Sequence, residues 1–187
     1  MDQLEDLFLS EGFAHLTIDA IVGQLRCSKM TLYTLAPSRE QLTSTVLRRF
    51  FDQATAAVEA AIGAGGSSEE RIRAGVVVPA EEMRRMTPTC FTDVLQFTTT
   101  RELFDTFAAS CTSLLTETLA GPGGSGSPRV RLVAEVVRLA LQDLYSGELA
   151  GRTNLDDGTA LDNLVATVIA AINAPNGAGR PRIRRVK

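Results

Sequence analysis

Apolar residues recur at helical spacing along nearly the whole chain. Ile18, Ile21, Val22 and Leu25 stand at positions i, i+3, i+4 and i+7, directly after Thr17, a residue that can cap a helix. No segment alternates apolar and polar residues with the period of two that marks a half-buried strand. The pattern predicts an all-α protein of about nine helices.

The predicted helices are short at the N-terminal end and long in the rest of the chain. The first ends at Gly12, and Ser28 caps another short helix that Pro37 ends. A Gly-rich break at 63–66 and the segment GPGGSGSP at 121–128 separate longer elements. These longer helices are predicted from Ser38 to about Ile62, from Glu69 to about Met86 with a kink or interruption at Pro79, from Pro88 to Leu119 as two helices divided near 98–100, from Pro128 to Ala150, and from Thr159 to Ala174.

The short helices at the N-terminal end favour a helix-turn-helix. A helix of about two to three turns is not stable alone in water, so these elements must pack crosswise around a shared core. In a helix-turn-helix the second helix places its N-terminal side chains in the DNA major groove, and helix N-termini bind phosphate. The residues predicted to contact DNA are Thr17, Ser28, Lys29, Met30, Thr31, Tyr33, Thr34, Ser38 and Arg39.

Positive charge is concentrated near these elements, although the chain as a whole has a net charge of −3. Residues 17–50 contain five basic and two acidic side chains, and the C-terminal run RPRIRRVK contains five more basic residues. A local basic patch is the electrostatic signature of a nucleic-acid-binding protein. The distribution favours double-stranded DNA as a partner, and the C-terminal run is expected to be a solvated basic tail.

Residues 4–42 resemble the DNA-binding head of TetR-family transcription regulators. The family pattern runs Leu-Phe, a Gly-Phe stop, Thr-(Ile/Val)-x-x-Ile, Ser-(Lys/Arg)-x-x-(Leu/Ile)-Tyr and Ser-Lys-(Glu/Asp)-x-Leu. The matching residues of this chain are Leu7-Phe8, Gly12-Phe13, Thr17-Ile18 with Ile21, Ser28-Lys29 with Leu32-Tyr33, and Ser38-Arg39-Glu40 with Leu42.

The resemblance implies a domain organisation and a function. Residues 1–47, here called the head, would form the helix-turn-helix DNA-binding domain. Residues 48–175, the body, would form a helical ligand-binding and dimerisation domain, followed by a flexible basic tail at 176–187. The implied protein is a homodimeric regulator that binds a palindromic operator and needs no cofactor. More specifically, the resemblance implies a repressor that a small-molecule effector releases from the operator.

Four positions depart from the family pattern. Arg26 stands in the turn where the family usually has Gly, and a non-Gly residue in a left-handed conformation costs about 1 kcal/mol or more. Met30 replaces a small residue at the start of the second helix, and Leu35-Ala36 replaces the usual residues after Tyr33. They support an alternative interpretation, a helical ligand-binding or interaction protein whose TetR-like head no longer reads DNA.

Other classes of function find little support in the sequence. It has no P-loop, no GxSxG and no HExxH motif, and a single His15 with three dispersed cysteines indicates neither an enzyme nor a metal site. No apolar run reaches the roughly 18 residues of a membrane span, and the N-terminal segment lacks the features of a secretory signal. We therefore expect a cytoplasmic protein with reduced cysteines and no membrane partner.

The last two predicted helices carry more apolar residues than one subunit needs. Two such pairs can close a four-helix interface about a two-fold axis, which predicts a homodimer. The alternative is a monomer in which the helix after Pro128 is fully buried. The apolar positions are Val130, Leu132, Val133, Val136, Val137, Leu139, Ala140, Leu141 and Leu144 in the first helix and Leu161, Leu164, Val165, Val168, Ile169 and Ile172 in the second.

Half of the eight phenylalanines fall within residues 91–107, close to methionines and cysteines. Aromatic rings and thioethers bury a large area and adapt their shape, so the cluster predicts a pocket for a small hydrophobic effector. The alternative is that these side chains fill an ordinary core between helices. The predicted pocket residues are Met83, Met86, Phe91, Phe97, Phe104, Phe107 and Cys111.

Overall fold

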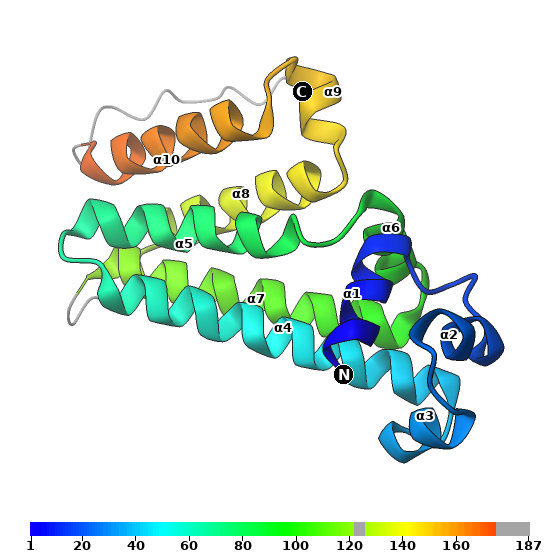
Figure 1. The fold of residues 1–187 in the computed structure, drawn as a ribbon. Coiled ribbons are helices and arrows are strands. Elements are labelled where there is room, and N and C mark those ends of the chain that lie inside the picture. The colour runs from blue at the N-terminus through cyan, green and yellow to red at the C-terminus, as the bar shows by residue number, and fades with distance from the viewer. Residues whose placement is uncertain (122–125, 175–187) are drawn as a thin grey trace, which may run out of the picture.

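The computed structural model describes residues 1–121 and 126–174, and these contain ten helices and no strand (Figure 1). The all-α prediction is confirmed. The predicted tail at 176–187 lies outside the described residues. The helices are α1 (Asp2–Glu11), α2 (Ile18–Leu25), α3 (Lys29–Leu35), α4 (Arg39–Ala64), α5 (Ser68–Met83), α6 (Pro88–Gln96), α7 (Thr98–Ala120), α8 (Pro128–Tyr145), α9 (Glu148–Thr153) and α10 (Asp157–Asn173).

The three predicted caps begin the helices of the N-terminal region. The hydroxyls of Thr17, Ser28 and Ser38 each accept a hydrogen bond from the backbone N–H three residues later, at distances of 3.1–3.2 Å. Each bond satisfies one of the N–H groups that a helix start leaves without an intrahelical partner. The short helices α2 and α3 therefore begin where the sequence predicts.

The prediction of one helix from Pro128 to Ala150 is wrong at its C-terminal end. It stops at Tyr145, and a separate short helix, α9, begins at Glu148. Gly147 lies between them with a φ of +76°, a left-handed conformation that ends a helix and that glycine adopts without strain. Pro79, in contrast, lies inside α5 and does not interrupt it, although α5 ends at Met83 rather than near Met86.

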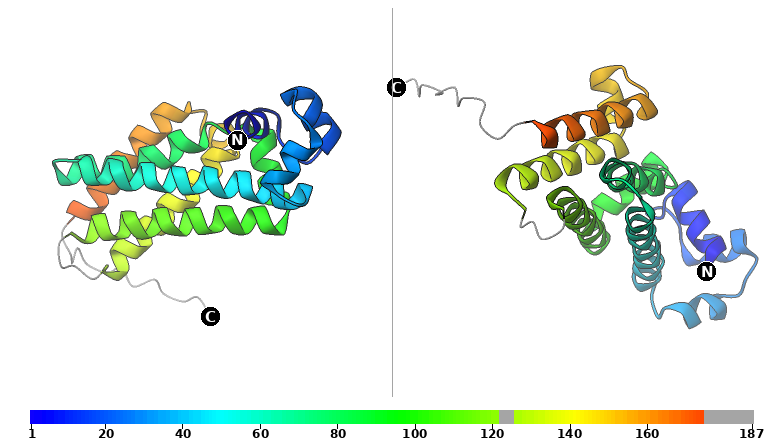
Figure 2. Two further views of the ribbon diagram at one scale, coloured as in Figure 1. Left: turned by 60° about the horizontal axis from the view of Figure 1, so that its bottom comes forward. Right: turned by 90° about the vertical axis from the view of Figure 1, so that its left-hand side faces the viewer.

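The body consists of two layers of helices. Helices α4, α5 and α7 pack against one another, and α8 and α10 cover α5 and α7 on the side away from the head (Figures 1 and 2). Helices α1, α2 and α3 lie at one end of this body, around the N-terminal part of α4. Because α4 runs without a break from Arg39 to Ala64, the predicted boundary at 47/48 falls inside a continuous helix.

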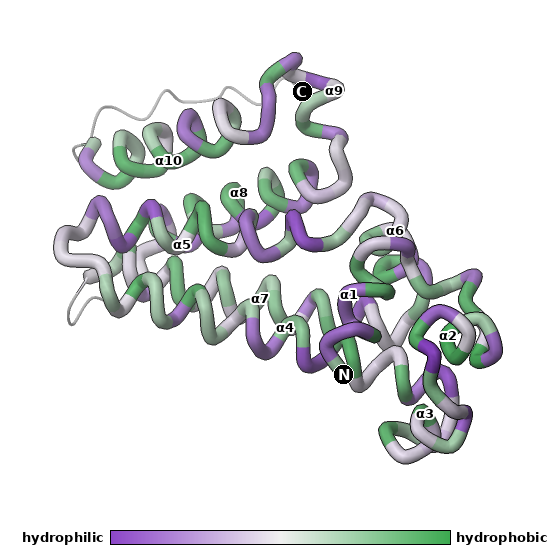
Figure 3. The backbone as a smooth tube through the Cα atoms, in the orientation of Figure 1, coloured by the Kyte–Doolittle hydropathy of each residue, from purple (hydrophilic) through white to green (hydrophobic). Residues whose placement is uncertain are grey.

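Two hydrophobic cores hold the molecule together. The first joins α1 and the helix-turn-helix to α4, α6 and α7, and its largest fully buried side chains include Phe8 and Phe50. The second lies between α5, α7, α8 and α10, and Leu115 and Val137 are buried in it. Apolar residues cover most of α10 (Figure 3).

None of the helices in the described ranges is long and apolar enough to cross a membrane.

Candidate DNA-binding head and body cavity

A three-residue turn connects α2 to α3. Arg26 occupies it with φ 50° and ψ 41°, a left-handed conformation, and its backbone N–H bonds to the carbonyl of Val22. Arg26 therefore has the left-handed conformation expected at the position where the family usually has glycine. Unlike glycine, arginine adopts this conformation at a steric cost.

Helix α3 exposes almost all of its side chains. Only Leu32 is buried, while Met30 is 73% exposed and Tyr33 is about half exposed. The structure therefore leaves most of the predicted DNA-contact residues exposed around α3, and their side chains are here called the α3 surface. Its members are Ser28, Lys29, Met30, Thr31, Tyr33 and Thr34.

Lys29 forms an ion pair within the head. Its Nζ lies 2.6 Å from a carboxylate oxygen of Asp19 in α2, and this hydrogen-bonded carboxylate raises the pKa of the lysine. Both side chains are more than half exposed, so the pair is screened by water. Lys29 can therefore exchange Asp19 for a phosphate at low cost.

The guanidinium of Arg39 contacts the head itself and is not part of the α3 surface. Its Nε donates to the carbonyl of Leu16 at 2.6 Å, and its Nη2 donates to the carbonyls of Phe13 and Ala14. The guanidinium is thus bound to the loop between α1 and α2, rather than projecting freely toward solvent as a phosphate ligand would.

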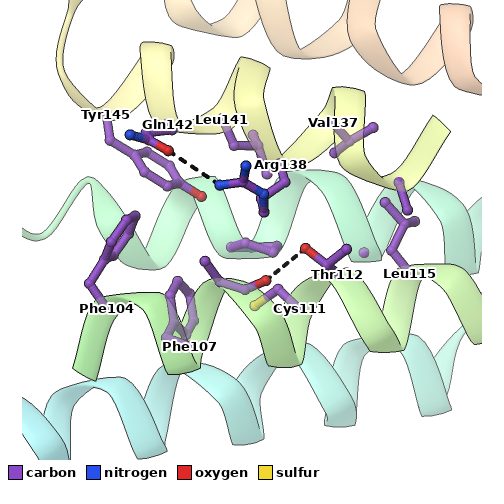
Figure 4. A pocket seen from close by; sticks show the side chains of 14 residues that line it. Phe104, Phe107, Cys111, Thr112, Leu115, Val137, Arg138, Leu141, Gln142 and Tyr145 are labelled. Atoms are coloured by element: carbon purple, nitrogen blue, oxygen red, sulfur yellow. Dashed lines mark hydrogen bonds between the residues drawn. The ribbon is translucent and has the colours of Figure 1, made fainter. Parts of the chain in front are cut away.

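A small cavity, here called the body cavity, lies between α5, α7 and α8 (Figure 4). Its volume is about 20 Å³, enough for about one water molecule. Phe104, Phe107 and Cys111 line it from α7, and burial raises the pKa of the Cys111 thiol to about 12, so this side chain is an uncharged, weakly polar group. The Tyr145 hydroxyl points toward Arg138 (Figure 4), and burial raises its pKa well above 10.

The arrangement of head and body matches a solved structure. A TetR-like transcriptional regulator from Rhodococcus sp. RHA1 superimposes with a TM-score of 0.66, over 93% of each chain, at 18% sequence identity. The chain has the TetR-like fold. No model of a known protein family and no curated protein sequence matches the chain.

Four predicted pocket residues of this TetR-like protein lie outside the lining of the body cavity. Phe91 packs edge to face against Phe104 of the lining, with the two ring centroids 5.3 Å apart. Met83 and Met86 are buried in the core that joins head and body. Phe97 is 40% exposed and lies against Phe13 of the head, because α6 ends and α7 begins at this residue.

The rest of the lining was missed by the sequence analysis because it comes from other helices. Pro79 and Gly75 approach from α5, and the charged side chain of the cavity lining is Arg138 of α8. Arg138 donates to Glu135 and to the side-chain oxygen of Gln142 at 3.3 Å (Figure 4). Arg138 is one of three arginines in α8, so the sequence alone does not distinguish it from Arg129 and Arg131.

Contacts between head and body also went unnoticed in the sequence. The carbonyl of Leu9, at the end of α1, accepts a hydrogen bond from the N–H of Thr87 at 2.9 Å. Glu5 of α1 is buried and pairs with Arg85 at 2.9 Å. Asp93 of α6 accepts two hydrogen bonds from the loop after α1. Of the residues in these contacts, only Asp93 stands out in the sequence, because it is a single acidic residue in a mainly uncharged stretch.

Proposed function

We propose that this protein is a sequence-specific DNA-binding regulator of transcription. The observation that supports this most directly is the α3 surface, where a seven-residue helix keeps only Leu32 in the core. A helix with one buried residue contributes little to the stability of the fold, so its exposed side chains are available for a partner. Its position after a capped α2 and a three-residue turn is that of a recognition helix.

The residues of the α3 surface suit base contacts of a particular kind. The helix, KMTLYTL, has no Arg, Asn or Gln, and its one lysine, Lys29, which could contact guanine, is paired with Asp19. Hydroxyls of Thr31 and Tyr33 can bond to base edges or phosphates, and the exposed Met30 supplies an apolar contact of the kind that thymine methyl groups make. We therefore propose half-sites that include thymines.

Removing a hydroxyl from the α3 surface tests this assignment. An operator is first selected from random duplexes with the wild-type chain. Thr31→Val and Tyr33→Phe are each expected to weaken operator binding by about 1 kcal/mol, the typical net value of one hydrogen bond. Fluorescence anisotropy measures the change, and Thr106→Val, at an exposed threonine of α7, is the matched control with no expected effect. Unchanged affinity in both head variants would remove these residues from the interface.

A homodimer is proposed from the outer face of α8. Leu132 is 64% exposed, and Val136 and Leu139 are each about half exposed, at spacings of four and three residues along one side of the helix. We call these three residues the α8 stripe. The alternative of a monomer required α8 to be fully buried, and these exposures show that it is not. Large exposed aliphatic side chains in a row are typical of an interface. A two-fold dimer presents two α3 surfaces, which suits a palindromic operator.

The size of the body cavity restricts the proposed effector. A ligand larger than one or two atoms fits only if α7 and α8 separate. Ala108, Thr112 and Arg138 are shared between the cavity and a groove of about 370 Å³ at the surface between these helices. We propose that a small hydrophobic molecule enters through this groove, displaces Arg138 and releases the DNA, which makes the regulator a repressor.

A thermal-shift screen of hydrophobic compounds tests the effector. A true ligand at about 100 times its Kd stabilises the fold by about 2.7 kcal/mol, and it is expected also to release operator DNA. Ala108→Phe, which fills the passage into the cavity, is expected to abolish both effects. Ala60→Phe, at an exposed position of α4, is expected to retain them. If no compound raises the melting temperature, the effector is removed from the proposal and the DNA-binding function is unaffected.

A further inference from the structure

The loop between α1 and α2 is held by a buried carboxylate from the body. Oδ2 of Asp93 in α6 accepts hydrogen bonds from the N–H of Phe13 at 2.7 Å and from the N–H of Ala14 at 2.8 Å. Asp93 is only 7% exposed. Hydrogen bonds to a charged group in a buried place are among the strongest that a protein forms.

A guanidinium holds the carbonyl groups of the same loop. Arg39, the first residue of α4, donates to the carbonyls of Phe13, Ala14 and Leu16, at 2.9 Å for Ala14 and 2.6 Å for Leu16. Phe13 and Ala14 thus have their N–H groups bound to an anion and their carbonyls bound to a cation. The loop and these two side chains together are here called the loop clamp.

Gly12 is part of the same construction. Its φ is +82°, and a Cβ at this position would lie 2.7 Å from Oδ2 of Asp93. Such an approach is shorter than two non-bonded atoms tolerate, and L-residues rarely adopt this φ. The glycine therefore allows the carboxylate to reach the two N–H groups that follow it.

The loop clamp joins the parts of the chain on both sides of the helix-turn-helix. The loop leads into the Thr17 cap of α2, and Arg39 follows directly after α3 and its connection to α4. Helix α2 fully buries Ile21 and packs Ile18, Val22 and Leu25 partly against the same core, whereas α3 buries only Leu32. The orientation of α3 therefore depends on α2 and on the segments at the ends of the helix-turn-helix.

We propose that Asp93 and Arg39 are positioning residues for DNA binding, which fix the orientation of α2 and α3 through the backbone of the loop clamp without contacting DNA. This inference rests on the proposed function. It differs from what the sequence motif implies, since there Arg39 is a DNA contact. Loss of either side chain would free the loop and allow the α3 surface to tilt relative to the groove.

Salt dependence separates a positioning residue from a phosphate contact. Each phosphate contact contributes about 0.9 to the slope of log affinity against log salt. Asp93→Ala and Arg39→Ala are each expected to weaken binding to the selected operator about tenfold or more, with the slope unchanged. Lys29→Ala, in contrast, is expected to reduce the slope by about 0.9. Asp52→Asn, at an exposed aspartate of α4, is the control without effect.

Hydrogen exchange gives a second measurement, on the loop itself. In Asp93→Ala the amides of Phe13 and Ala14 are expected to exchange faster, while the amides within α4 keep their protection. If Asp93→Ala does not fold, Asp93→Asn retains one acceptor oxygen and is expected to weaken operator binding about threefold. Circular dichroism confirms that each variant is folded before its affinity is measured.

Two results would overturn the inference and leave the proposed function intact. One is a folded Asp93→Ala, or a folded Asp93→Asn where the alanine variant does not fold, that binds the operator as tightly as wild type. The other is a shallower salt slope in Arg39→Ala, which would make Arg39 a phosphate contact. A wild-type chain that selects no DNA sequence would overturn the proposed function and this inference together.

Discussion

Replacing Phe50 by alanine is expected to lower the free energy of unfolding by about 3–5 kcal/mol. Phe50 is fully buried in the middle of α4, in the core that joins head and body. Its ring meets the edge of Phe51 at a centroid distance of 5.3 Å, and the guanidinium of Arg85 lies over it at 5.1 Å. Truncation removes these contacts and leaves a cavity that the surrounding helices can close only in part.

Urea denaturation followed by circular dichroism measures this change. Phe97→Ala is the matched control, because Phe97 is 40% exposed and its main ring contact is with Phe13 at 6.0 Å. It is expected to cost less than about 1.5 kcal/mol. Equal losses in the two variants would show that α4 does not anchor the core in the way described.

Two aspartates in the α8 stripe are expected to dissociate the proposed homodimer. In Val136→Asp/Leu139→Asp the two chains place four carboxylates in the proposed apolar interface, where an unpaired buried charge costs several kcal/mol. Dimer affinity is expected to fall by more than about 100-fold. Operator affinity falls with it, because a monomer can bind only one half-site at a time.

Light scattering at micromolar concentration is the measurement. The wild type is expected to have the mass of two chains and the double variant the mass of one. Gln53→Asp, which adds a charge at an exposed position of α4, is expected to remain dimeric. A monomeric wild type would contradict the dimer, and a dimeric double variant would place the interface elsewhere.

Much of the fold was predictable because its signals are local. Thr17, Ser28 and Ser38 mark helix starts through bonds to residues three positions away, and apolar periodicity marks the buried faces of the long helices. The end of α8 was predicted wrongly although its signal is also local. Gly147, two residues after Tyr145, is a residue that commonly ends a helix, but Leu149 and Ala150 resume the apolar pattern beyond it.

The candidate site, too, was predictable where its residues are close in sequence and not where they are far apart. The residues of the α3 surface follow one another in a short motif, so the sequence places them together. Asp93 and the loop that it binds are about 80 residues apart in the chain, and nothing local in the sequence indicates that they meet. The charged residue of the body cavity lining, Arg138, was not predicted for the same reason. The phenylalanine cluster predicted part of the lining, but it could not show that Phe97 turns toward the head.

Helix α6 contacts both regions to which we assign a function. On one side Asp93 holds the loop clamp, and on the other the ring of Phe91 lies 5.3 Å from Phe104 and 6.0 Å from Tyr145, two residues of the body cavity lining. The helix that is bonded to the head therefore also packs against the lining of the body cavity.

The ratio of operator affinity to non-specific affinity tests the central claim most directly. Fluorescence anisotropy at fixed salt compares the duplex selected by the wild-type chain with a duplex of the same composition in scrambled order. A DNA-reading head is expected to bind the selected duplex about 10³-fold or more tightly than the scrambled one, and to lose most of that ratio in Thr31→Val/Tyr33→Phe. Equal binding to both duplexes, or a random pool from which no sequence is enriched, would contradict the claim and favour a TetR-like head that no longer reads DNA.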